Sequence, residues 1–166
     1  MRIFIFLFMF FSIAASAGDP VWVHKVDSPV DSIYRSIYQS LEEARFYVVL
    51  EPDIGKNISR FSERWGDEYN RNGLTQIRSM VFCNAWYANQ VANADPEMLA
   101  LCPLHITMTE KDGRSTVLFV RPSALARGTG AETVAKEIEN KVIKAIETAT
   151  ANSDSPEPAM QKKPVN

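Results

Sequence analysis

The stretch from residue 104 to residue 120 constrains the fold most, because it carries the pattern of a β-hairpin. Apolar Leu104, Ile106 and Met108 alternate with polar neighbours, Asp112-Gly113 follow, and residues 115–120 return as a second β-rich run. Alternation with a period of two is typical of a strand with one buried face, and Asp-Gly is a preferred two-residue turn. The chain is therefore expected to build a sheet that contains this antiparallel pair.

Strand and helix signals alternate along the rest of the chain. We expect strands at 21–26, 46–50 and 75–83, and helices at about 30–45, 54–65, 85–93 and 131–149. Ser28, Asp53 and Asn84 are the expected caps of the first three helices, since their side-chain oxygens accept a first-turn N–H. In the last helix, Glu137 and Lys141 have the spacing of an ion pair. The predicted order is βαβαβαββα.

This order predicts an α+β fold, with helices packed on one face of a mainly antiparallel sheet. In the strand at 75–83, Ile77, Val81 and Cys83 lie on one face and Met80 and Phe82 on the other. We take Trp22, Met80 and Phe82 as candidates for the sheet face that the helices leave open. Such an apolar face predicts a homodimer. Periodicity leaves the strand order undetermined.

The first 17 residues read as a signal peptide rather than as part of the fold. Arg2 supplies a positive charge, residues 3–13 are apolar except for Ser12, and residues 15–17 are small. The apolar stretch is shorter than the ~20 residues that span a bilayer. We predict cleavage after Ala17, a periplasmic or secreted product, and no membrane insertion after cleavage.

The remaining composition defines one modest domain. Residues 18–149 are expected to form a single α+β domain, and residues 150–166, rich in proline and poor in large apolar side chains, a disordered polar tail. The formal net charge of the whole chain is −2. This charge gives no electrostatic footprint for a phosphate backbone, so we expect no nucleic-acid partner.

Five short motifs resemble successive landmarks of one protein family. They are FYVVLEPDIG at 46–55, FCN at 82–84, NADP at 93–96, LCP at 101–103 and VRP at 120–122. In this order they resemble the family called domain of unknown function 302, over residues 23–125. The resemblance implies a compact α+β domain that tends to dimerise, and it implies no reaction. The family places proline before cysteine ahead of the hairpin, whereas this chain has Cys102 before Pro103, so a pocket built around the usual order does not carry over unchanged.

The two cysteines admit three interpretations. An exported chain with Cys83 and Cys102 can form one disulfide. Alternatively, Cys102 and His105 can hold a metal or a haem, with Cys83, Met80, Met108 or His24 as further soft ligands. The spacing contains only one Cys/His pair, and no Cys-x-x-Cys-His motif is present for covalent haem. In the third interpretation both thiols are buried small hydrophobes. The cofactor stays open.

We place the candidate ligand site where two elements begin. Its residues are Cys83, Asn84, Trp86 and Tyr87 around the third helix, together with Cys102 and His105 at the hairpin entry. Aromatic and amide side chains at a helix N-terminus can line a small-ligand pocket. They can equally serve the core, which we favour for Trp86 and Tyr87.

The sequence therefore predicts an exported, non-enzymatic domain that binds a small ligand or assists an envelope or redox process. The alternative is a metal- or haem-binding redox protein that uses Cys102 and His105, and a thiol-dependent enzyme comes third. Glu51, Asp53 and Glu63 are weaker candidates for paired catalytic carboxylates. Asp53 stands where a helix cap belongs, and Glu63 falls on a polar helix face.

Overall fold

The computed structural model describes residues 19–151, so the predicted leader and residues 152–166 of the predicted tail lie outside the described residues. Five strands form the sheet: β1 (Val21–Val26), β2 (Tyr47–Leu50), β3 (Gln76–Cys83), β4 (Leu104–Lys111) and β5 (Arg114–Val120). The longer helices are α1 (Val30–Glu43), α4 (Ala85–Ala94) and α6 (Glu132–Thr150). Short helical segments are α2 (Ile54–Ser59), α3 (Ser62–Trp65), η1 (Gly66–Glu68), η2 (Pro96–Leu101) and α5 (Pro122–Leu125). The predicted α+β class and the order of its main elements are confirmed.

The five strands lie in the order β1-β5-β4-β3-β2, and every neighbouring pair is antiparallel. The predicted hairpin is its centre, with Lys111 paired to Arg114 across the turn. Asp112 and Gly113 have φ values of 53° and 71°, the left-handed backbone that a type I′ turn requires at both central residues. The hairpin thus sets the sheet's centre, and the other strands add to its two sides.

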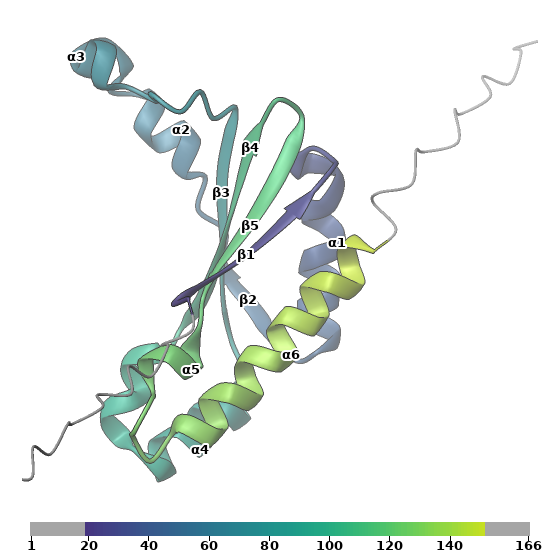
Figure 1. Cartoon of the computed structure of the whole chain (residues 1–166), viewed down its shortest axis with the longest axis vertical. Coiled ribbons are helices and arrows are strands. Elements are labelled where there is room, and N and C mark those ends of the chain that lie inside the picture. Colours follow the sequence, from purple (N-terminus) through teal and green to yellow (C-terminus); the bar gives the residue numbers. More distant parts are fainter. Residues whose placement is uncertain (1–18, 152–166) are drawn as a thin grey trace, which may run out of the picture.

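Helices α1 and α6 cover one face of this sheet, as Figure 1 shows. The core between these helices and the sheet is apolar, and its largest fully buried side chains include Phe46, Phe82, Phe119, Met80 and Ile106. A side-chain hydrogen bond from Ser40 Oγ to the Ala145 carbonyl, 2.8 Å long, joins the two helices. Helix α4, with η2 and α5, lies at the opposite end of the sheet from α2 and α3 (Figure 1).

The assignment of Met80 and Phe82 to the open face is wrong. Both side chains are fully buried. In the observed register they pair with Ile106 and Leu104, which are buried on the helix-covered face, so they share that face. Trp22 also lies on that face: it pairs with buried Phe119, packs against the core and stacks on His24. Both apolar sets of β3 satisfy a period of two, and only the pairing with β4 decides which set is covered.

The other face of the sheet carries a different apolar set, which we name the open face. It consists of Val21 and Val23 of β1, Leu118 and Val120 of β5, Ile77, Val81 and Cys83 of β3, and Tyr47 and Leu50 of β2, with threonines and His105 of β4 between them. Val23 is 50% exposed and Leu50 is 59% exposed. One chain is described, so the predicted homodimer stays a prediction.

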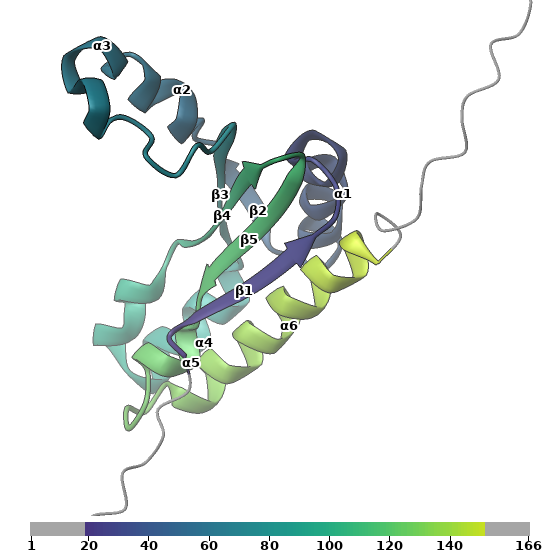
Figure 2. The same cartoon turned by 45° about the horizontal axis from the view of Figure 1, so that its top comes forward.

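The link between β2 and β3 forms an arm rather than the single predicted helix over 54–65. Helices α2 and α3 are separate because Phe61, at φ −110° and ψ 7°, leaves the helical backbone between them. The arm (residues 54–68) projects from the end of the sheet (Figure 2). Its base approaches β3 so closely that a Cβ on Gly55 would lie 3.2 Å from the Ile77 nitrogen.

The predicted caps of α2 and α4 are confirmed, whereas α1 is capped differently. Asp53 accepts from Lys56 N at 2.8 Å and Asn84 accepts from Tyr87 N at 3.1 Å. At α1 the N-cap position is Pro29 rather than Ser28, and buried Glu110 of β4 accepts from Val30 N at 2.8 Å. A carboxylate at a helix N-terminus also matches the helix dipole.

Between residues 19 and 151, no helix combines the length and the apolar character needed to cross a bilayer.

Candidate functional site

The six predicted site residues divide into three adjacent groups at the α4 end of the sheet. Asn84, Trp86 and Tyr87 line a pocket at the start of α4. His105 lines a smaller cavity of about 130 Å³ with Pro103 and residues of β5 and α5. Cys83 and Cys102 interact, because a hydrogen bond with Cys83 contributes to the raised pKa of the Cys102 thiol. The predicted single site is therefore not one cavity.

The larger space, which we name the α4 pocket, has a volume of about 600 Å³. It is bounded by the end of α1, the start of β2, the first turn of α4 and the middle of α6. Its lining residues are Glu43, Ala44, Arg45, Tyr47, Asn84, Ala85, Trp86, Tyr87, Glu137 and Lys141. Three segments distant in sequence, residues 43–47, residues 84–87 and the middle of α6, thus meet at one concave surface.

Tyr87 fixes the floor of the α4 pocket. Its ring stacks on Phe46 with centroids 5.8 Å apart, and Lys141 Nζ lies 5.8 Å from its centroid. The phenol donates a 2.6 Å hydrogen bond to Glu137. Burial raises the pKa of Tyr87 to about 12, with the hydrogen bond to Glu137 as the next cause. The phenol is therefore a neutral donor at physiological pH.

The rim of the pocket is aromatic and exposed. The Trp86 side chain is 65% exposed and that of Tyr47 is 55% exposed. The expectation that Trp86 serves the core is wrong, because it occupies the outer face of the first turn of α4. The same expectation is confirmed for Tyr87, which is buried.

Two cations of the pocket have no carboxylate partner among residues 19–151. Arg45 follows α1 in a left-handed conformation, with φ 64°, and the Lys141 ammonium lies over the Tyr87 ring; neither side chain is in an ion pair of the described residues. The predicted ion pair of Glu137 with Lys141 is absent from the described ion pairs, because Glu137 accepts from Tyr87 instead. The pocket therefore presents Arg45 and Lys141 with unused hydrogen-bond donors.

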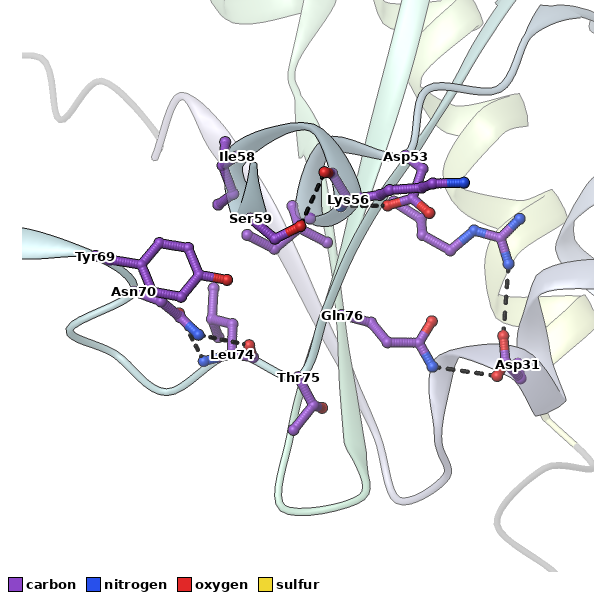
Figure 3. A pocket seen from close by; sticks show the side chains of 13 residues that line it. Asp31, Asp53, Lys56, Ile58, Ser59, Tyr69, Asn70, Leu74, Thr75 and Gln76 are labelled. Atoms are coloured by element: carbon purple, nitrogen blue, oxygen red, sulfur yellow. Dashed lines mark hydrogen bonds and ion pairs between the residues drawn. The ribbon is translucent and has the colours of Figure 1, made fainter. Parts of the chain in front are cut away.

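A second cavity of about 530 Å³, the arm pocket, lies between the arm and β3 (Figure 3). Its polar groups mostly bind one another. Asp31 accepts from Gln76 Nε2 at 3.2 Å and from Arg78 Nη1 at 3.5 Å. The Asn70 side chain donates to the Leu74 carbonyl and accepts from the Leu74 N–H. Asp53 is occupied as the cap of α2. These internal contacts favour a structural role for the arm pocket.

The carboxylates weighed as catalytic candidates have structural partners or lie apart. Glu51 accepts a 2.6 Å hydrogen bond from Tyr34, Asp53 caps α2, and Glu63 lies exposed in α3. Burial, followed by this hydrogen bond, raises the pKa of Tyr34 to about 12. The Arg78 guanidinium lies 3.6 Å from the Tyr34 ring centroid.

No group of three His, Cys, Asp or Glu side chains within residues 19–151 is arranged to hold a metal ion. Cys102 and His105 therefore lack a third such ligand in the described chain. His24, another candidate, belongs to the edge strand β1, where it contacts Thr150 Oγ1 at 2.9 Å and stacks on Trp22.

Sequence reasoning missed Arg45, Tyr47, Glu137 and Lys141. Tyr47 opens the apolar run of β2 and looks like one more core residue, while Arg45 ends a helix with an ordinary polar residue. Only the packing of α6 beside α4 brings Glu137 and Lys141 to the pocket. The period of α6 marks both residues as surface positions, and a surface position does not reveal which element packs beside it.

Comparison with known proteins gives a family and a fold. No curated protein matches the chain. A crystal structure described as an uncharacterized conserved protein DUF302 from Bacillus stearothermophilus is similar, with a TM-score of 0.66 and 15% sequence identity. The similarity covers 78% of this chain and 98% of that one. The family described as Domain of unknown function DUF302 matches residues 22–149, and the chain belongs to it.

Proposed function

We propose that this chain is an exported, non-enzymatic domain that binds a small carboxylate with a flat apolar group in the α4 pocket. One observation carries the proposal: exposed aromatic rings of Trp86 and Tyr47 stand beside Arg45 and Lys141, whose charges are unpaired in the described chain. Rings offer a stacking surface and the two cations offer charged donors.

The size and polarity of the pocket support this ligand class. Small-molecule sites commonly measure roughly 300–1,000 Å³ and combine apolar walls with a few polar groups. The Asn84 side chain caps Tyr87 N, and the preceding N–H groups of the first turn of α4 favour an anion nearby. Glu43 and Glu137 oppose that charge, but Glu137 is held by Tyr87.

A matched pair of probes tests the charge preference. We expect phenylacetate to bind, measured by calorimetry and by tryptophan fluorescence, and 2-phenylethylamine to bind at least about tenfold more weakly, a difference of roughly 1.4 kcal/mol. Stronger binding of the amine, or no binding of the acid at millimolar concentration, would show the proposed ligand class to be wrong.

Variants locate the binding. Trp86→Ala and Arg45→Gln should each weaken phenylacetate binding. Trp65→Ala is the matched control, because Trp65 is also an exposed tryptophan, 41% accessible, but lies on the arm. Equal losses of phenylacetate affinity in the Trp65 and Trp86 variants would show that the ligand does not bind in the α4 pocket.

We also propose that the chain is exported, on the support of the charged and apolar leader at residues 1–17. Expression with this leader should yield a product in the periplasm that begins at Gly18. N-terminal sequencing of the recovered protein checks this, and a full-length product retained in the cytoplasm would contradict it.

We propose further that a second copy of the chain covers the open face and leaves its α4 end, with Tyr47 and Cys83, accessible. Its support is the row of exposed apolar side chains at both edges of the sheet, Val23 and Val120 on one side and Leu50 on the other. Large exposed apolar patches are uncommon on monomers, and an isologous dimer would bury the open face of both copies.

Light scattering tests the dimer. Leu118→Lys places a charge near the centre of the open face and should give a monomer. Gln39→Lys adds the same charge on the exposed side of α1 and should leave the dimer intact. A wild-type protein that runs at monomer mass across concentrations would contradict the proposal.

A further inference from the structure

The two cysteines come together through the sheet register rather than through the sequence. Cys83 is the last residue of β3, and Cys102 ends η2 two residues before β4. Phe82 pairs with Leu104, so continuing the antiparallel register brings Cys83 beside Pro103 and its neighbour Cys102. The backbone thereby delivers both thiols to the same end of the sheet.

Both cysteines are free, and both side chains are half-buried. Burial raises the pKa of the Cys102 thiol, followed by the charge of Cys83 and a hydrogen bond with Cys83. A hydrogen bond that raises the pKa of Cys102 is one in which its S–H donates. The Cys83 sulfur is thus the acceptor of the pair.

We propose that Cys83 and Cys102 are a redox-active dithiol that closes to an intramolecular disulfide by exchange with a disulfide-bearing oxidant, Cys83 reacting first. This modification site is independent of the α4 pocket, although Tyr47, the cross-strand partner of Cys83, lines that pocket.

The exchange balances in two steps. The Cys83 thiolate attacks one sulfur of the oxidant, the oxidant's S–S bond breaks, and the first leaving thiolate takes up a proton. Cys102 then loses its proton, its thiolate attacks the Cys83 sulfur, and the second oxidant thiol leaves. The dithiol is oxidised by two electrons and the oxidant's disulfide is reduced to two thiols. Adjacent sulfurs favour the second step over release of the mixed disulfide.

Oxidised glutathione is the probe for the wild-type protein. The reduced full chain should lose both titratable thiols and, by mass spectrometry, end lighter by two hydrogen atoms without retained glutathione. Thiols that both persist in excess oxidised glutathione would overturn the proposal. Stable glutathione adducts on the wild type, or disulfides between chains on a non-reducing gel, would overturn it as well.

Single variants test the assigned order. Cys102→Ser should trap one glutathione on Cys83. Cys83→Ser should form its adduct at least about tenfold more slowly, because burial, the largest cause of the raised pKa of the Cys102 thiol, remains in that variant. Faster adduct formation in Cys83→Ser would overturn the order. Phenylacetate binding is measured on the same samples, so failure of the dithiol and failure of the α4 pocket give separate readouts.

Discussion

Substitution of Phe82 by alanine should remove much of the stability of the domain. The Phe82 side chain is fully buried against the helix layer and meets Phe46 edge-to-face, with centroids 6.0 Å apart at 81°. Truncation of a buried phenylalanine costs about 3–5 kcal/mol, counting the lost transfer free energy and the cavity that remains. The free energy of unfolding of a typical domain is only about 5–15 kcal/mol.

The adjacent residue in β3 supplies a matched control. Val81 points to the open face and is half-buried. Val81→Ala removes two carbons worth about 0.8 kcal/mol each when fully buried, so a half-buried site should lose roughly 0.8 kcal/mol. The two substitutions therefore differ in expected effect by a factor of about four to six, although they stand next to each other on one strand.

Urea unfolding monitored by circular dichroism measures both effects. The protein is kept reduced, so that no disulfide contributes. It is measured over a range of concentrations, because a contribution from dimerisation would change with concentration. Phe82→Ala should lower the unfolding midpoint far more than Val81→Ala. A larger loss for Val81→Ala at every concentration would refute the assignment of the two faces.

Three further predictions concern α6, α4 and the loop between α5 and α6. Glu139→Ala should lower the free energy of unfolding in urea by about 3 kcal/mol, because this buried carboxylate accepts from Arg121 at 2.6 Å and from both the N–H and the hydroxyl of Ser123. The control Glu147→Ala, at an exposed position of the same helix, should lower it little. The pKa of Tyr87 is about 12 in the folded state against 10.0 unfolded, so the stability from its protonated phenol is complete below pH 10 and is lost as the pH rises toward 12. Tyr87→Phe should flatten that alkaline loss in a pH series of thermal melts, and an unchanged slope would contradict the reasoning. Gly130→Ala should lower the melting temperature, since its Cβ would lie 2.4 Å from the Ala94 carbonyl oxygen, and an unchanged melt would contradict that contact.

The local features of the fold were predictable because their signals are local. The Asp112-Gly113 turn and the caps at Asp53 and Asn84 depend on residues within four positions of one another. The cap of α1 depends on Glu110, which lies 80 residues from Val30. A sequence pattern around Pro29 therefore indicates where the helix begins but not which group satisfies its first N–H.

The faces of β3 were assigned wrongly for a related reason. Its two alternating sets, Ile77 with Val81 and Met80 with Phe82, are both apolar, so composition does not distinguish them. The neighbouring strand does distinguish them, because β4 has one apolar and one polar set, and the observed register couples Met80 to its apolar Ile106. Strand pairing carries the missing information, and in this chain 20 residues of helix and connection separate β3 from β4.

The same pairing determines the chemistry of the candidate sites. Cys83 and Cys102 were predicted as partners from their number alone, whereas the pairing of Phe82 with Leu104 explains why they lie at the same end of the sheet. The α4 pocket depends instead on helix packing, since Lys141 reaches Tyr87 only because α6 runs beside α4. A one-residue slip of β3 against β4 would turn Cys83 toward the core and separate the thiols, while leaving the α6 contribution to the pocket in place. Oxidation of the dithiol therefore reports on the strand register, and ligand binding reports on the helix layer.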